Sequence, residues 1–179
     1  MTATQTAATT VQAPQVGRYE IDTRGSTVTF RGRHLFGLFP VRGTLAIRHG
    51  TFDIAEPITD SSVQVEIDAA SFDTGNRQRD HDVRSARFLD ADRYPAMTFA
   101  STRLERSRDS TLAGTLTVRN VARPLSLMIE RYTITPASPR SLEVWASTRI
   151  DRTDFGLVAA KGMAGRHLDV SLRILGVRR

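Results

Sequence analysis

Histidine is the side chain best suited to acid–base catalysis or metal binding near neutral pH, and the chain contains four: His34, His49, His81 and His167. They lie far apart, with neither the i, i+4 spacing nor the HExxH pattern of a zinc site. His81 stands between Asp80 and Asp82, but adjacent residues of a helix point in different directions and do not converge on one ion. The sequence therefore predicts no metal site, no cofactor and no catalytic residue.

Two other patterns suggest chemistry that the rest of the chain does not support. The sequence Asp154-Phe155-Gly156 matches the DFG of protein kinases, but a kinase also needs a Gly-rich loop, a strand lysine and an HRD loop, which the sequence lacks. We expect this stretch to form a β-turn or bulge in which the glycine relieves the backbone. No serine lies in a GxSxG elbow, and the chain has no cysteine for a disulfide or a thiolate nucleophile.

The charges argue against a nucleic-acid partner. The formal net charge is +6, and Lys161 is the single lysine among 25 basic residues. A nucleic-acid-binding protein concentrates its basic side chains on one stripe. Here they alternate with acids, as between Arg77 and Arg84, and we interpret this pattern as a solvated surface of mixed charge.

The N-terminal stretch carries no targeting signal that we recognise. A secretory signal needs a basic start and an apolar run of about 7–15 residues, and MTATQTAATTVQAPQV has neither. No segment approaches the roughly 20 apolar residues of a membrane span. We therefore expect a cytoplasmic protein.

The chain divides into a tail and one domain. Residues 1–17 are rich in Thr, Ala and Gln and are predicted to form a disordered tail, because they offer too little apolar surface to offset the entropy of ordering. Residues 18–179 form the domain, in which apolar and polar residues alternate as in strands with one buried face. Eight such runs occur, at 27–32, 41–48, 63–68, 97–99, 112–118, 125–129, 142–146 and 168–174. They predict an all-β, eight-stranded antiparallel barrel, because closure removes the exposed edges.

One helix interrupts the strands. Asn76 is a good N-cap for a short helix that runs to about Ser85, followed by a turn at 86–89. Val83 and Phe88 would pack this insertion onto the barrel mouth. A barrel of eight strands is either filled by side chains or holds one small ligand. The small residues on the inward face permit sharp strand bends or leave space inside; they are Gly32, Gly43, Gly114 and Ala146.

An ordered set of short motifs covers about residues 18–175. It consists of Tyr19-Glu20-Ile21-Asp22, Ser26–Phe30, Arg33-His34, Val41-Arg42-Gly43, Ser62–Asn76, Arg79-Asp80, Phe88, Tyr94–Phe99, Gly114–Val118, Arg123-Pro124-Leu125 and Asp151–Leu157. In this order the motifs resemble the YceI family of lipocalin-like, polyisoprenoid-binding proteins. The helix departs from the family pattern Arg-Asp-x-His-Leu, because Asp82 stands where the family has histidine and His81 lies one place earlier.

The resemblance implies a lipocalin-like barrel that binds, stores or carries a long-chain hydrophobic ligand, such as a polyisoprenoid, a polyprenyl phosphate or a quinone, without catalysis. We expect the ligand's tail to contact Phe30, Phe36, Phe39, Leu45, Phe99, Leu116, Phe155 and Leu157. His34, Arg79 and Asp80 are the candidates near its polar head. The alternative for the apolar set is a solid core, and for Arg79 and Asp80 an ion pair that fastens the helix to the barrel.

The sequence is also compatible with two other functions. One is an enzyme that acts on a hydrophobic substrate at the barrel mouth, with Asp80, His81, Asp82 or His34 as acid or base. The other is a protein-interaction module with a solid barrel. A ligand-binding barrel implies three partners: an isoprenoid or other long-chain lipid, a membrane surface in transient contact, and a second copy in a homodimer.

Overall fold

The computed structural model describes residues 13–34, 38–106, 110–135, 138–160 and 164–179, so most of the predicted tail lies outside it. The strands are β1 (Gly17–Ile21), β2 (Thr27–His34), β3 (Phe39–Leu45), β4 (Ile47–Ile54), β5 (Ser62–Asp68), β6 (Ala96–Arg106), β7 (Ser110–Val118), β8 (Val121–Thr135), β9 (Ser138–Asp151) and β10 (His167–Arg178). The helices are α1 (Arg77–Arg84) and the 3-10 turns η1 (Ile58–Asp60), η2 (Ala69–Ser71) and η3 (Arg152–Phe155). No helix in the described ranges is long and apolar enough to cross a membrane.

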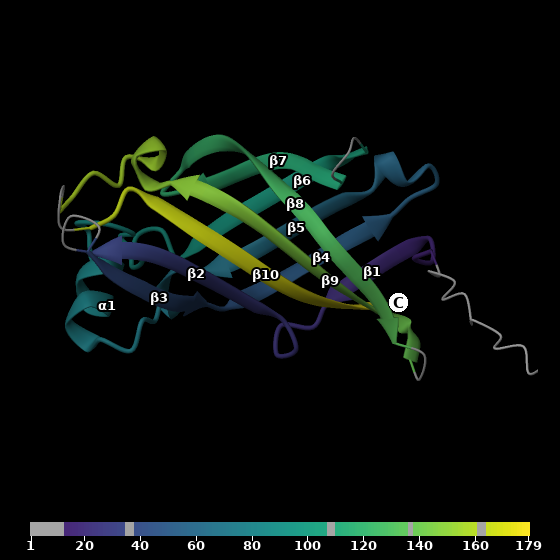
Figure 1. Ribbon diagram of the computed structural model, residues 1–179, viewed down its shortest axis with the longest axis horizontal. Helices are drawn as coiled ribbons and strands as arrows, with labels where there is room; N and C mark the ends of the chain where they lie inside the picture. The colour runs from purple at the N-terminus through teal and green to yellow at the C-terminus, as the bar shows by residue number, and fades with distance from the viewer. Residues whose placement is uncertain (1–12, 35–37, 107–109, 136–137, 161–163) are drawn as a thin grey trace, which may run out of the picture.

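The strands form one closed antiparallel barrel. The sheet closes because β1 pairs with β4 on one side and with β10 on the other. β1 and β2 lie end to end along one edge of β10, and β4 and β3 follow them in turn. If each of these two pairs is counted as one interrupted strand, the barrel has eight strands, as predicted. Figure 1 shows the barrel from the side, with α1 at one end (the helix end) and the C-terminus towards the other (the far end).

The insertion after β5 completes the barrel wall at the helix end. The backbones of Thr44 and Asp73 exchange hydrogen bonds of 2.8 and 3.1 Å, which tie this insertion to β3. Asn76 then caps α1, because its side chain accepts a hydrogen bond from the Arg79 backbone N–H at 3.0 Å. The predicted helix and its cap are therefore confirmed.

The turn that follows α1 is held against the barrel. The backbone N–H of Leu89 donates to the carbonyl of Val83 at 2.9 Å. Arg119, in the turn between β7 and β8, donates to the carbonyl of Phe88 at 2.7 Å. These bonds direct Val83, Phe88 and Leu89 towards the barrel interior, where all three line a cavity.

Two of the inward-facing glycines make room for aromatic rings. Phe30 lies opposite Gly43 in the register of β2 and β3, and a Cβ on Gly43 would lie 2.3 Å from its ring. A Cβ on Gly114 would likewise lie 2.6 Å from the ring of Phe99. The space left by these glycines is therefore filled by Phe30 and Phe99, which form part of the inner wall.

Candidate ligand-binding site

The barrel is hollow. A cavity of about 240 Å³ lies at the helix end, and a second of about 350 Å³ extends towards the far end. The two share a wall at the waist of the barrel, made by Val28, Val65, Ile67, Phe99, Leu127 and Leu172. Because they share these side chains, the two cavities adjoin and together form a mostly apolar lumen.

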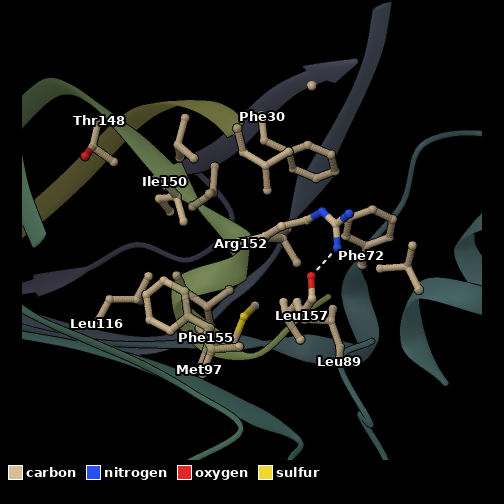
Figure 2. Close-up of a pocket in the computed structure, with 18 of the residues that line it drawn as sticks. Phe30, Phe72, Leu89, Met97, Leu116, Thr148, Ile150, Arg152, Phe155 and Leu157 are labelled. Atoms are coloured by element: carbon tan, nitrogen blue, oxygen red, sulfur yellow. Dashed lines mark hydrogen bonds between the residues drawn. The ribbon is translucent and has the colours of Figure 1, made fainter. Parts of the chain in front are cut away.

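The wall of the helix-end cavity is mostly aromatic and aliphatic. Phe30 stacks on Phe72, with ring centroids 4.9 Å apart. Figure 2 shows Met97, Leu116 and Phe155 below these rings and Ile150 beside them. Such a surface gains free energy in proportion to the apolar area that a ligand removes from water, and it discriminates poorly between ligands of similar shape.

The polar side chains on this wall are basic or neutral. Arg33, Arg79, Arg152 and Thr148 line the cavity, and no Asp or Glu of the described chain lines it. The three arginines, with no carboxylate among the described lining residues, give the helix-end cavity a positive character. Burying a cation in an apolar wall costs free energy unless its N–H groups are hydrogen-bonded.

Arg152 is the most deeply placed of the three, with 7 % of its surface exposed. Its Nε donates to the carbonyl of Gly165 at 2.8 Å, its second nitrogen to Leu157, and its third to Ala164 at 3.0 Å. Figure 2 shows the side chain entering the cavity beside Phe72. Burial lowers the pKa of Arg152 and the charge of nearby Asp151 opposes this shift, but no described carboxylate forms an ion pair with its guanidinium.

The turn η3 positions Arg152. Asp151 caps the turn by accepting from the backbone N–H of Thr153 at 2.9 Å and from its hydroxyl at 2.6 Å, and it pairs with Arg166 at 2.5 Å. These hydrogen bonds lower the pKa of Asp151 from 3.8 to about 2, and the bond from the Thr153 hydroxyl has the largest effect. The turn ends at Gly156, whose φ of 74° favours glycine. The predicted β-turn or bulge is thus a 3-10 turn with a left-handed glycine at its end.

Arg79 and Asp80 are joined through a hydroxyl. The Thr74 hydroxyl donates to Asp80 at 2.5 Å and accepts from Nε of Arg79 at 2.7 Å. The backbone N–H of Thr74 also donates to Asp80, at 3.0 Å. Burial opposes ionisation of Asp80, but these bonds from Thr74 lower its pKa overall. Asp80 therefore fastens the start of α1 to the preceding turn. Instead of forming an ion pair with each other, Asp80 and Arg79 both hydrogen-bond to the hydroxyl of Thr74.

The structure places most, but not all, of the predicted ligand contacts on the cavity wall. Those that line the helix-end cavity are Phe30, Leu45, Arg79, Phe99, Leu116, Phe155 and Leu157. Asp80 is buried against Thr74 instead, and Phe39 is 56 % exposed at the end of the β2–β3 ladder. Phe36 and the side chain of His34 lie outside the described residues.

Sequence reasoning missed Arg152 and Phe72. Arg152 lies inside the Asp151–Leu157 motif that carries the family resemblance, so its presence was visible but its direction was not. Phe72 follows a strand and belongs to no alternating run. No periodic signal could have placed its ring opposite Phe30.

Of the groups expected of an enzyme, Asp80, His81 and Asp82 do not line either cavity, and the side chain of His34 lies outside the described residues. Asp82 pairs with Arg87 at 2.7 Å. Asp53, on the wall of the far-end cavity, accepts from Arg18, and this hydrogen bond lowers its pKa. Within the described ranges no three His, Asp or Glu side chains gather where they could hold a metal ion. The solid barrel expected for an interaction module is contradicted by the two cavities.

Comparison with known proteins agrees with this geometry. The model of the YceI-like domain matches residues 19–175. The chain belongs to this family. Among its YceI-like relatives, a UPF0312 protein of Enterobacter sp. (strain 638) is 33 % identical over 167 residues, which cover 89 % of this chain and 86 % of the relative.

Solved structures of other proteins share this fold. BcnA of Burkholderia cenocepacia superposes with a TM-score of 0.74 at 18 % identity, over 87 % of this chain and 98 % of BcnA. A polyisoprenoid binding domain from Saccharophagus degradans, implicated in plant cell wall breakdown, superposes with a TM-score of 0.67 at 15 % identity. That match covers 92 % of this chain and all of the domain. At these identities the likeness establishes the fold.

Proposed function

We propose that this YceI-like protein binds one long-chain amphiphile of the polyisoprenoid class inside the barrel and stores or carries it without chemical change. The observation that carries the proposal is the apolar lumen formed by the two adjoining cavities. Support also comes from the family and from the polyisoprenoid binding domain of Saccharophagus degradans that shares the fold. Among the described residues that line the two cavities, no pair is suited to act as acid and base.

Enclosure of the tail must supply most of the affinity. Each buried CH2 contributes about 0.8 kcal/mol, so about a dozen carbons yield on the order of 10 kcal/mol. Association itself costs about 4–15 kcal/mol. Either cavity alone would hold only part of a long tail, so useful affinity requires the ligand to pass the waist from one cavity to the other.

The arginines at the helix end favour an anionic head over a neutral one. Each guanidinium has five N–H donors, and the hydrogen bonds to protein partners use only some of those on Arg79 and Arg152. The remaining donors would form charge-assisted hydrogen bonds with a phosphate at this end. The carbonyls of a quinone would gain less from the same donors. We therefore favour a polyprenyl phosphate over a quinone among the ligands that the lumen can hold.

The first test is native mass spectrometry of the purified protein, with organic extraction of any adduct. The expected result is a discrete adduct whose extract is a long-chain amphiphile. A protein without adduct that also stays unloaded after incubation with geranylgeranyl phosphate and with geranylgeraniol would overturn the proposal. The two probes share a tail, so they separate the contribution of the head from that of the lumen.

The head group is tested by comparing the affinities of these two probes. A charge-assisted hydrogen bond contributes about 1.5–3 kcal/mol, so we expect the phosphate to bind about 10- to 150-fold more tightly. Arg79→Met and Arg152→Met should each reduce that ratio, whereas Arg140→Gln, an exposed residue at the far end, should leave it unchanged. Equal affinities in the wild-type protein would exclude an anionic head site but not the lumen.

A further inference from the structure

Large apolar side chains are exposed at the helix end. Leu38 is 74 % exposed and Phe39 adjoins it at the start of β3. Val158, 48 % exposed, lies in the segment that follows η3. Gly165, further along the same connection between η3 and β10, is hydrogen-bonded to β2: its backbone N–H donates to the carbonyl of Arg33 at 2.7 Å. Figure 1 shows the ends of β2, β3 and β9 together at this end of the barrel, beside α1.

These side chains belong to segments that also supply the wall of the helix-end cavity. Arg33 and Gly165, which line the cavity, belong to the same two segments that carry Phe39 and Val158. Leu38 and Phe39 follow immediately beyond the rung in which Arg33 pairs with Pro40. Neither cavity is lined by Leu38, Phe39 or Val158, so none of the three serves as a wall of the lumen. The rim of the mouth therefore presents apolar surface to whatever lies outside it.

The same hairpin is basic on its outer face. Residues 27–45, which span this hairpin, contain three arginines and no Asp or Glu. Arg31 and Arg42 are cross-strand partners in β2 and β3, both are exposed, and neither forms an ion pair with a described residue. On the neighbouring strand Asp169 lies opposite Arg31, but it is paired with Arg149 at 3.1 Å. Every Asp, Glu, Lys or Arg residue within the β2–β3 hairpin is therefore an arginine.

We propose that the rim formed by Leu38, Phe39 and Val158 docks on the surface of an anionic phospholipid bilayer. The apolar side chains enter the interfacial layer, and the arginines of β2 and β3 face the lipid phosphates. This orientation places the cavity mouth against the membrane, so an amphiphile passes between bilayer and lumen without crossing water. The docking surface does not depend on which amphiphile the lumen holds.

Co-sedimentation of the protein with vesicles tests the proposal. We expect it to bind vesicles of phosphatidylcholine with phosphatidylglycerol, and to bind vesicles of phosphatidylcholine alone much less. The double variant Leu38→Ser with Phe39→Ser should lose on the order of tenfold or more in partitioning, because burial of either side chain favours the bound state. Val177→Ser is the matched control, since Val177 is 42 % exposed on β10 towards the far end.

Charge variants separate the electrostatic contribution from insertion. Each basic residue near an anionic surface contributes about fivefold in partitioning, so Arg31→Gln and Arg42→Gln should each weaken binding by about that factor. Arg140→Gln, at the far end, should not. All of these side chains are exposed, and unchanged thermal unfolding will show that the variants keep their fold.

A fluorescent label reports which surface enters the bilayer. The chain has no cysteine, so Leu38→Cys and Val177→Cys each carry one solvatochromic label. We expect a blue shift on addition of anionic vesicles for the first and none for the second. The proposal is overturned if the protein does not sediment with anionic vesicles, if the double variant binds as the wild type does, or if the label at position 38 stays in water. A dimer that the double variant dissociates, without vesicle binding, would make a second copy the occupant. These measurements use lipid-free protein, so their failure leaves the ligand proposal standing.

Discussion

Replacement of Val65 by phenylalanine tests whether the barrel is hollow, and it does so more directly than shortening a side chain on the cavity wall would. Val65 lies on β5 opposite Phe99 of β6, and it lines both cavities at the waist. The larger side chain would place about four more carbon atoms in the lumen, where they displace a similar number of ligand carbons. At about 0.8 kcal/mol for each carbon, the ligand loses about 3 kcal/mol of binding free energy. A displacement titration with geranylgeranyl phosphate should therefore give a dissociation constant on the order of 100-fold weaker.

Although Val65→Phe should weaken ligand binding, it should not lower the thermal stability of the protein without ligand. In a filled core the added ring would cost about 1–3 kcal/mol through overpacking, and each kcal/mol lowers the melting temperature of a domain of this size by about 2–4 °C. In an empty apolar lumen the ring finds space and buries apolar surface. We expect Val65→Phe without ligand to melt at or above the wild-type temperature.

The control is Gln64→Phe, which adds an aromatic side chain on the exposed outer face of the same strand. It should change neither the affinity nor the melting temperature appreciably. A clear fall in the melting temperature of Val65→Phe would show that the waist has no room for the ring. Unchanged affinity would show that the ligand does not pass the waist, and either result would refute the continuous lumen.

Two further predictions concern the elements that frame the mouth. Asn76→Ala removes the acceptor for the Arg79 backbone N–H and should lower the free energy of unfolding by about 1 kcal/mol, seen as a fall of about 2–4 °C in the melting temperature, whereas Asn76→Asp should keep most of the cap. Asp151→Asn should destabilise the protein at neutral pH, because the ionised carboxylate is stabilised in the folded state, where its pKa is about 2 instead of 3.8. That advantage of the wild type is complete above pH 3.8 and disappears as the pH falls through 2, so urea unfolding should show the two proteins converging across this window; a constant difference would contradict the assignment.

The strands and the helix cap were readable from local sequence because each depends on neighbouring residues. Alternation of apolar and polar side chains marks a strand with one buried face, and Asn76 can cap a helix wherever the chain turns there. The interruption between β1 and β2 was not readable, because it depends on their sharing one edge of β10, more than a hundred residues away. Local pattern carries no information about such a shared partner.

The candidate site divides in the same way. Phe30, Phe99 and Leu116 lie in alternating runs and were predicted as ligand contacts, and the structure places all three on the cavity wall. The inward phase did not predict that Phe30 and Phe99 would occupy the space beside glycines, because this depends on the cross-strand register. Phe39 shows the limit of the approach. An aromatic residue beside a predicted strand looks like core, yet its position at the end of the ladder leaves it on the rim.

By itself the sequence determined that the chain forms a β-barrel with a capped helix at one mouth, since alternation, turn residues and the cap act over a few residues. It also carried the ordered motifs of the YceI-like family. Only the tertiary structure decided that the barrel is hollow, because a cavity is the volume left after all eight strands have closed. The same closure turns Arg152 into the lumen and leaves Leu38 and Phe39 at its edge. These positions depend on the packing of distant segments, and no local pattern specifies them.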